Sequence, residues 1–255
     1  MCWPTQRTPS LGLLTQVTTS KPYHLASAAF VCATAAGYVI LDLPSNSYLA
    51  LDAATGRGLE LLVDGWPKPA AQSAEAAPNT IEEAAEALIQ AGVIATVSSK
   101  APWVNRSKVS IDGPLSSIGE ELGQLGSINF REVFVFLYVL ITVALDLRFR
   151  RFYSVIRRTA DLKSHLRQQE SDYFRAIGLV QTYRRLRVYA FRSDGHCLFH
   201  ALTLVRFLSY YGIDASFVIG VRTDPWGAHS WAQRGNVLLD TSPEKVCAFQ
   251  PILCI

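Results

Sequence analysis

The stretch "DGHCLFHALTLVRFLSYYG", residues 194–212, combines the apolar spacing of a core helix with a thiol near its start. Apolar side chains recur at helical intervals, and Gly212 stands where a glycine commonly ends a helix. Asp194 or Gly195 is the expected N-cap, so Cys197 falls in the first helical turn. Because unpaired N–H groups and the helix dipole favour a thiolate there, the stretch predicts a reactive cysteine at the mouth of a buried helix.

Two other interpretations of this stretch remain open. A metal site would draw its ligands from His196, Cys197 and His200, with Cys247 and Cys254 as further ligands. Zinc sites usually contain a Cys-x-x-Cys pair or a second paired cluster, which this sequence lacks, so we expect no metal ion and no cofactor. The two histidines are then expected at the rim of the site or on the surface. An inert, packed cysteine is the second alternative, and the helix alone does not exclude it.

Three strands are predicted downstream of this helix. Their sequences are "ASFVIGVR" (215–222), "AHSWAQ" (228–233) and "VLLD" (237–240). Gly235-Asn236 between the last two is a favourable two-residue hairpin turn. The C-terminal half of the chain therefore predicts a core helix packed on an antiparallel sheet.

The hairpin turn determines which side chains share a face of this sheet. If Arg234 pairs with Val237, Asp240 lies opposite Trp231 and becomes a diagonal neighbour of His229. A slip of one residue would put the imidazole and the carboxylate on opposite faces. Thiol catalysis needs an imidazole that takes and returns the proton and a carboxylate that orients the ring. The spacing thus predicts a base and its orienting acid beside the cysteine.

Composition and charge describe a soluble globular protein without a disulfide framework. The chain has 255 residues, which is long enough for two domains. Its residues are 49% hydrophobic and 18% charged, with a net charge of +3, a composition typical of globular proteins. The five cysteines are irregularly spaced, and the N-terminus has no basic segment followed by a long apolar run. We therefore expect a reduced, cytoplasmic protein.

Two segments bear on membrane and nucleic-acid binding. The apolar run Val133–Leu145 is shorter than the roughly 20 residues of a spanning helix, so we expect a buried core helix and no membrane association. Arginines are dense between Arg148 and Arg187, but no aromatic–basic interleaving accompanies them. We interpret them as a solvated helix face and expect no nucleic-acid partner.

Changes in amino-acid composition along the chain divide it into two domains of an α+β protein. An N-terminal extension is followed by an alanine-rich domain with short strand-like runs, a linker rich in Ser, Gly and Pro, and an arginine-rich domain with the thiol. Their predicted bounds are 1–21, 22–98, 99–128 and 129–255.

Within the first domain, "GYVILDLPSNSYLALD" (37–52) predicts two strands joined by a tight turn. The following helix includes Leu59, Leu62 and Val63 on one face. A second helix is predicted from a capping box of Thr80 and Glu83 to Gly92, with a short strand after it. These elements predict a small module of winged-helix type.

This module resembles the PqqD-like elements that recognise precursor peptides in ribosomal peptide biosynthesis. The resemblance covers "VILDLPSNSYLALDAATGRGLELL" (39–62) and "IEEAAEALIQAGVIA" (81–95). It implies that a leader peptide adds a strand to an exposed sheet edge beside the second helix. The implied contact residues are Ser47, Tyr48, Leu49, Ala50, Leu51, Glu83 and Ala87. A folded domain without a ligand is the alternative.

The second domain resembles the lasso-peptide biosynthesis B proteins, which are leader peptidases. The matching residues are "CLFHALTLVRFLSYYGIDASFVIGVRTDPWGAHSWAQRGNVLLD" (197–240). The order of Cys, His and Asp is that of the papain-like and transglutaminase-like fold. The resemblance implies that Cys197 is the nucleophile, His229 the general base and acid, and Asp240 the orienting carboxylate. Papain-like enzymes place a glutamine shortly before the cysteine, and residues 191–196 contain none.

The two resemblances together imply a cysteine peptidase that binds a precursor leader and cuts it from the core peptide. An asparagine-synthetase-like cyclase is the implied partner, which joins the freed amine to an acidic side chain. Two alternatives stay open. The same side chains would serve a transglutaminase-like acyl transferase, and a catalytically inactive domain would leave a leader-binding scaffold.

Overall fold

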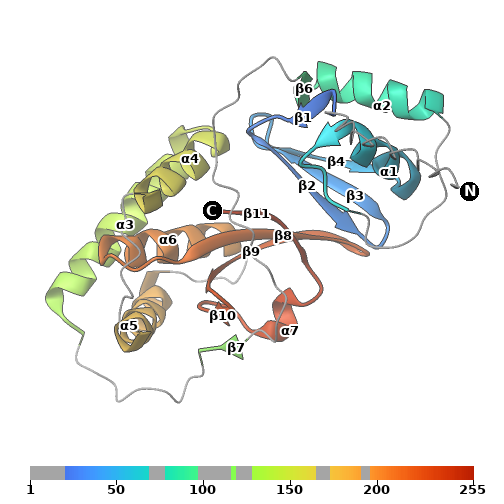
Figure 1. Ribbon diagram of the computed structural model, residues 1–255. Coiled ribbons are helices and arrows are strands. Elements are labelled where there is room, and N and C mark those ends of the chain that lie inside the picture. Colours follow the sequence, from blue (N-terminus) through green and yellow to red (C-terminus); the bar gives the residue numbers. More distant parts are fainter. Residues whose placement is uncertain (1–20, 69–77, 97–115, 119–127, 165–172, 191–195) are drawn as a thin grey trace, which may run out of the picture.

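The computed structural model describes residues 21–68, 78–96, 116–118, 128–164, 173–190 and 196–255. Helices and strands are mixed in both halves of the chain, as the predicted α+β class requires. The N-terminal half carries small sheets with two helices, and the C-terminal half gathers helices beside a larger sheet (Figure 1).

The described N-terminal half contains two three-stranded sheets, of order β2-β3-β4 and β5-β1-β6. Its elements are β1 (Tyr23–Leu25), β2 (Ala29–Thr34), β3 (Gly37–Asp42), β4 (Ser47–Leu51), α1 (Ala53–Leu62), β5 (Val63–Asp64), α2 (Pro78–Gln90) and β6 (Ile94–Thr96). The predicted pair β3–β4, both helices and the final short strand are confirmed. The sequence patterns did not reveal β1, β2 or β5, which are short or lack a clear alternation.

The predicted helix ends are partly wrong. Asp52 caps α1, and Val63 belongs to β5, so it does not continue the apolar face of the helix. Helix α2 begins two residues before Thr80, so Thr80 and Glu83 lie inside it and do not form the predicted capping box. Gly92, with φ of +72°, ends this helix as predicted.

Strand β3 is buried on both faces. Val39 and Leu41 face an apolar core shared with the C-terminal half, whereas Tyr38 and Ile40 face a core built with α1 and α2. A side chain on Gly56 of α1 would collide with the Tyr38 ring, so glycine is what lets this helix approach the sheet. The β2-β3-β4 sheet is therefore a layer between two cores, and it ties the two halves together.

The C-terminal half has a five-stranded sheet of order β11-β8-β9-β10-β7. Its elements are β7 (Ser116–Ser117), α3 (Phe130–Phe149), α4 (Phe152–Ser164), α5 (Tyr173–Ala190), α6 (Cys197–Tyr210), β8 (Ser216–Thr223), β9 (Trp226–Arg234), β10 (Val237–Leu238), α7 (Pro243–Val246) and β11 (Gln250–Cys254). The first two predicted strands match β8 and β9. The third is shorter than predicted, because β10 ends at Leu238.

Helix α6 is the centre of this half. It packs against α3, α4 and α5 and against β8 and β9, and every side chain from His200 to Leu208 is buried. Gly212, with φ of +77°, follows its end as predicted. The predicted N-cap is wrong, since His196 takes that position, and residues 191–195 lie outside the described ones. Because α6 is enclosed in this way, its first residue, Cys197, is held in a fixed position.

Helix α3 is longer and more exposed than predicted. The apolar run Val133–Leu145 was expected to be a buried core helix, but α3 begins at a capping box of Asn129 and Glu132 and buries only one side. Its exposed large apolar side chains are Phe130, Phe134, Leu137, Tyr138, Ile141, Leu145 and Phe149. No helix among the described residues is long and apolar enough to cross a membrane.

The predicted linker contains part of the sheet. Strand β7 pairs in parallel with β10, and Ile118 after it is buried in the shared core. Arg184 of α5 donates to the carbonyl oxygens of Ile118 (2.9 Å) and Leu239 (3.0 Å). This arginine, expected on a solvated face, instead holds the sheet edge to a helix.

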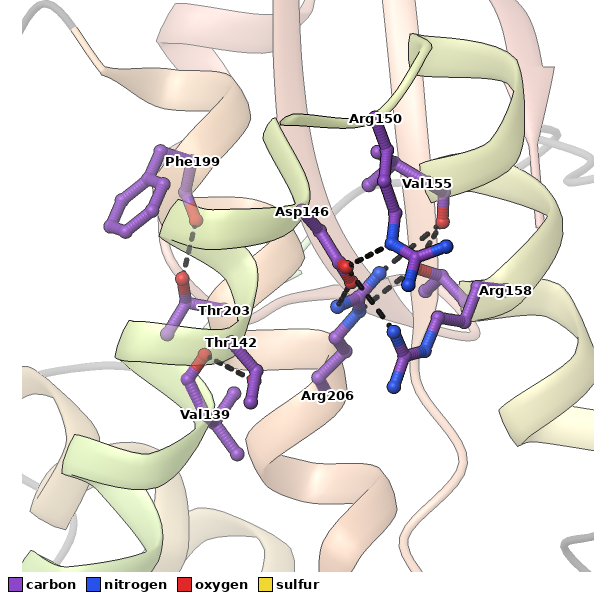
Figure 2. A network of polar contacts seen from close by, with 10 residues as sticks. Val139, Thr142, Asp146, Arg150, Val155, Arg158, Phe199, Thr203 and Arg206 are labelled. Carbon is purple, nitrogen blue, oxygen red and sulfur yellow. Dashed lines mark hydrogen bonds and ion pairs between the residues drawn. The ribbon is translucent and has the colours of Figure 1, made fainter. Parts of the chain in front are cut away.

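A buried charge network joins α6 to α3 and α4 (Figure 2). Arg206, 6% exposed, donates to the Asp146 carboxylate at 2.6 Å and to the Thr159 hydroxyl at 3.0 Å. Arg150 and Arg158, which are about half exposed, contact the same carboxylate at 2.9 and 3.2 Å. Burial alone would raise the pKa of Asp146, but the arginines reverse this and hold it below its usual range. The network holds α3 and α4 against α6.

Candidate active site

Cys197 is the first residue of α6 and is half-buried. Its pKa is lowered from 9.0 to about 6, chiefly by interaction with His229. Burial opposes this shift, and the side chain and backbone N–H of Ser230 add to it. The thiol is therefore largely ionised at neutral pH, which is the state that a nucleophile needs.

The end of β10 leaves room for this thiol. Ser230 pairs with Ile219 of β8 on one side of β9. On the other side β10 stops at Leu238 in the described structure, and the backbone N–H of Ser230 interacts with Cys197. Sequence patterns did not identify Ser230 as part of the site. The Ser230 N–H is available because β10 ends early, and no sequence pattern predicts this early end.

His229 lies on β9 between two aromatic rings. Its ring stacks on Trp231 at 6.1 Å between centroids and tilts against Phe249 at 5.5 Å. A Cβ on Gly220, its cross-strand neighbour, would lie 2.7 Å from the Trp231 ring and 2.9 Å from Phe249 Cβ. Trp231 is fully buried and forms one side of this stack. The stack holds the imidazole in one orientation.

His229 Nε2 is buried and has no hydrogen-bond partner among the described residues. The interaction of the imidazole with the thiol lowers the pKa of Cys197. An imidazole beside a thiol is suited to take up its proton, and catalytic contacts often shorten only when substrate binds.

Asp240 reaches the site by a route that the hairpin pattern did not predict. The register of Arg234 with Val237 is confirmed, but the ladder ends before Asp240 can pair with Trp231. Its carboxylate instead bends back and accepts from the Ala232 N–H at 2.9 Å. Burial raises its pKa to about 6, while the Ala232 N–H and the charge of His229 act in the opposite direction. The carboxylate is thus within electrostatic range of the imidazole, but in the described structure it hydrogen-bonds to backbone.

The neighbouring histidines differ from each other. His196 is exposed, which fits the predicted rim position, but His200 is buried within α6, so that prediction is wrong for it. Among the residues that the structure describes, no group of three or more His, Cys, Asp or Glu side chains is arranged to hold a metal ion.

The residues expected to bind a leader divide into two groups. Strand β4 is an edge strand of its sheet, with Leu49 and Ala50 exposed and its other side chains half-buried. Glu83 and Ala87 are exposed on α2, which packs on α1 and β6 (Figure 1). The structure therefore groups the β4 residues at one edge but does not bring the two α2 residues to it.

Alkylation of Cys197 by iodoacetamide is expected to accelerate through a midpoint near pH 6, well below the ordinary thiol value of 9.0, because the thiolate is the reactive form. In a His229→Ala variant this midpoint is expected to move upward. Peptide mass spectrometry resolves Cys197 from the exposed Cys247 and from Cys32, whose pKa burial raises to about 12. A midpoint above about 8 for the unmodified protein would contradict an activated thiol.

Comparison with known proteins relates this chain to a superfamily and to a processing protein. Residues 139–254 match the Transglutaminase-like superfamily, so the C-terminal domain is transglutaminase-like. The microcin J25-processing protein McjB of Escherichia coli is 43% identical over 53 residues, which are 21% of this chain and 24% of that relative. The matched part thus spans about a quarter of the relative's length. No solved structure gives a significant match.

Proposed function

We propose that this protein is a leader peptidase of lasso-peptide biosynthesis, which binds a precursor peptide and hydrolyses the bond between leader and core. The observation that carries the proposal is the Cys197 thiol, with its pKa lowered to about 6 by His229, within a transglutaminase-like domain. The similarity to a microcin-processing protein supports a peptide substrate of this class.

In the proposed reaction, the Cys197 thiolate attacks the carbonyl carbon of the last leader residue and His229 carries the proton. The Cys197 backbone N–H lies in the first turn of α6, where N–H groups have no partner within the helix, and donates to the developing oxyanion. His229 then protonates the departing amine of the core, and a thioester to the leader remains. Water, deprotonated by His229, hydrolyses this thioester and restores the thiol. Asp240 supports the positive charge on the ring electrostatically.

The N-terminal domain is proposed to act as a PqqD-like recognition element. Its edge strand β4 offers main-chain groups for strand addition, and Leu49 and Ala50 project from it into solvent. A leader held there keeps the scissile bond at a high local concentration near the thiol.

The freed core amine is proposed to pass to an asparagine-synthetase-like cyclase, in the cytoplasm where the precursor is made. The exposed apolar face of α3, flanked by Arg131, Arg148, Arg150 and Arg151, is the candidate contact surface. Exposed contiguous apolar faces of this kind commonly mark protein interfaces.

Two alternatives use the same architecture. A transglutaminase-like acyl transferase would pass the thioester to an amine instead of water, and a scaffold would bind the leader without cutting it. The low pKa of the Cys197 thiol favours either catalytic role over the scaffold.

The test is incubation of the purified protein in H₂¹⁸O with a lasso-peptide precursor made of leader and core, followed by mass spectrometry. We expect free core peptide together with leader that carries one ¹⁸O atom in its new carboxylate. Leader joined to an amine without ¹⁸O would establish acyl transfer. Intact precursor that nonetheless binds, measured by anisotropy of a labelled leader, would establish the scaffold.

A further inference from the structure

The N-terminal sheet approaches the candidate active site through one aromatic contact. Tyr48 of β4 lies opposite Leu41, on the face of the sheet that packs on the C-terminal half. Its ring meets Trp226 edge-on, at 5.6 Å between centroids and an interplanar angle of 73°. Trp226 is the first residue of β9 and 53% exposed, so the pair lies at the surface where the two domains meet.

The same tyrosine is close to the thiol. Burial, and after it the negative charge of Cys197, raise the pKa of Tyr48. Trp226 and Ser230 are four residues apart on β9, so their side chains share one face of the sheet, and Ser230 interacts with Cys197. Tyr48 and Trp226 thus border the reacting groups from two domains, while Leu49, next along β4, faces the opposite side of the sheet with Ile40.

We propose that the Tyr48–Trp226 pair is the subsite for the last leader residues before the scissile bond. This inference rests on the proposed function. A leader precedes its core, so its C-terminal end must reach the thiol. Tyr48 and Trp226 lie on the side of their strands that faces the thiol, so the last leader residues are the ones that pass the pair.

The chemistry of the pair defines the residue it accepts. Two aromatic rings at an edge-on angle present apolar surface with a phenol hydroxyl at its border. They suit an uncharged side chain, and a carboxylate there would also meet the negative thiolate of Cys197. When a leader is bound to the N-terminal domain, the pair positions its scissile peptide bond at the thiol of the C-terminal domain.

The first test compares Tyr48→Ala, Tyr48→Phe and Trp226→Ala with wild type, and uses Leu61→Ala on the exposed outer face of α1 as the control. We expect both ring deletions to lower kcat/KM for precursor cleavage by about tenfold or more, because misplaced substrate reacts slowly. Tyr48→Phe should restore most of this loss. Leader affinity and the alkylation rate of Cys197 should stay near wild type.

Unchanged kcat/KM in both ring deletions would overturn the proposal, as would a loss explained entirely by weaker leader binding or by a less reactive thiol. The subsite is also tested with a photo-crosslinking residue placed either at the last or at an early leader position of the precursor. The last position should label the Tyr48–Trp226 region, and labelling of this region by the early position alone would overturn the proposal. Wild-type protein that fails to cleave would instead count against the proposed function itself.

Discussion

Replacement of Cys197 by alanine is expected to abolish precursor cleavage, with a loss of at least about 10³-fold in rate, because the proposed mechanism forms its thioester on this sulfur. The side chain stands at the start of α6 with its pKa lowered to about 6, and its removal leaves the enclosed helix intact. The variant should therefore fold normally and still bind labelled leader. Cleavage is followed by chromatography of the free core peptide.

Cys247→Ala is the matched control for this substitution, because Cys247 is also a free cysteine but is exposed outside the site. It should cleave at the wild-type rate. Wild-type activity in Cys197→Ala would refute the covalent mechanism, and precursor processing in cells without any thiol requirement would favour the scaffold.

Replacement of Asp146 by alanine is expected to destabilise the protein by about 3–5 kcal/mol, since it leaves the buried Arg206 charge without its partner. Arg206 contacts this carboxylate at 2.6 Å, and both side chains are about 5% exposed. The free energy of unfolding in urea measures the loss. A change below about 1 kcal/mol would show that water reaches Arg206 and compensates its charge.

Arg150→Ala provides the control for this network, because Arg150 contacts the same carboxylate but is 54% exposed. It should cost less than about 1 kcal/mol. The lowered pKa of Asp146 also fixes the pH dependence. The ionised Asp146 carboxylate stabilises the folded protein fully above the ordinary carboxyl pKa of 3.8. This stabilisation is lost as the pH falls through the lower pKa of the folded state. Acid sensitivity should therefore decrease in Asp146→Ala.

Local sequence rules were sufficient for the helix and hairpin that carry the candidate site. The apolar spacing and Gly212 located α6, and Gly235-Asn236 set the register of β9 and β10. Those signals depend on residues close together in the chain. The helix start was misjudged because capping preferences are weak where tertiary contacts enclose the whole helix.

Non-local packing decided the remaining features. Whether Asp240 continued a strand or turned back to Ala232 depended on where β7 and β10 stop, which no local pattern encodes. The apolar run in α3 predicted burial, but only one of its faces found a partner in the described structure.

The amino-acid order by itself determined that a thiol would begin a core helix and that an imidazole would follow on a strand of known register. Only the tertiary structure decided that Ser230 would meet the thiol, that Arg206 would be neutralised by Asp146, and that Tyr48 would come from another domain to the same place. The physical reason is that helix and turn preferences act over a few residues, whereas burial and charge pairing depend on chain segments that meet only after folding.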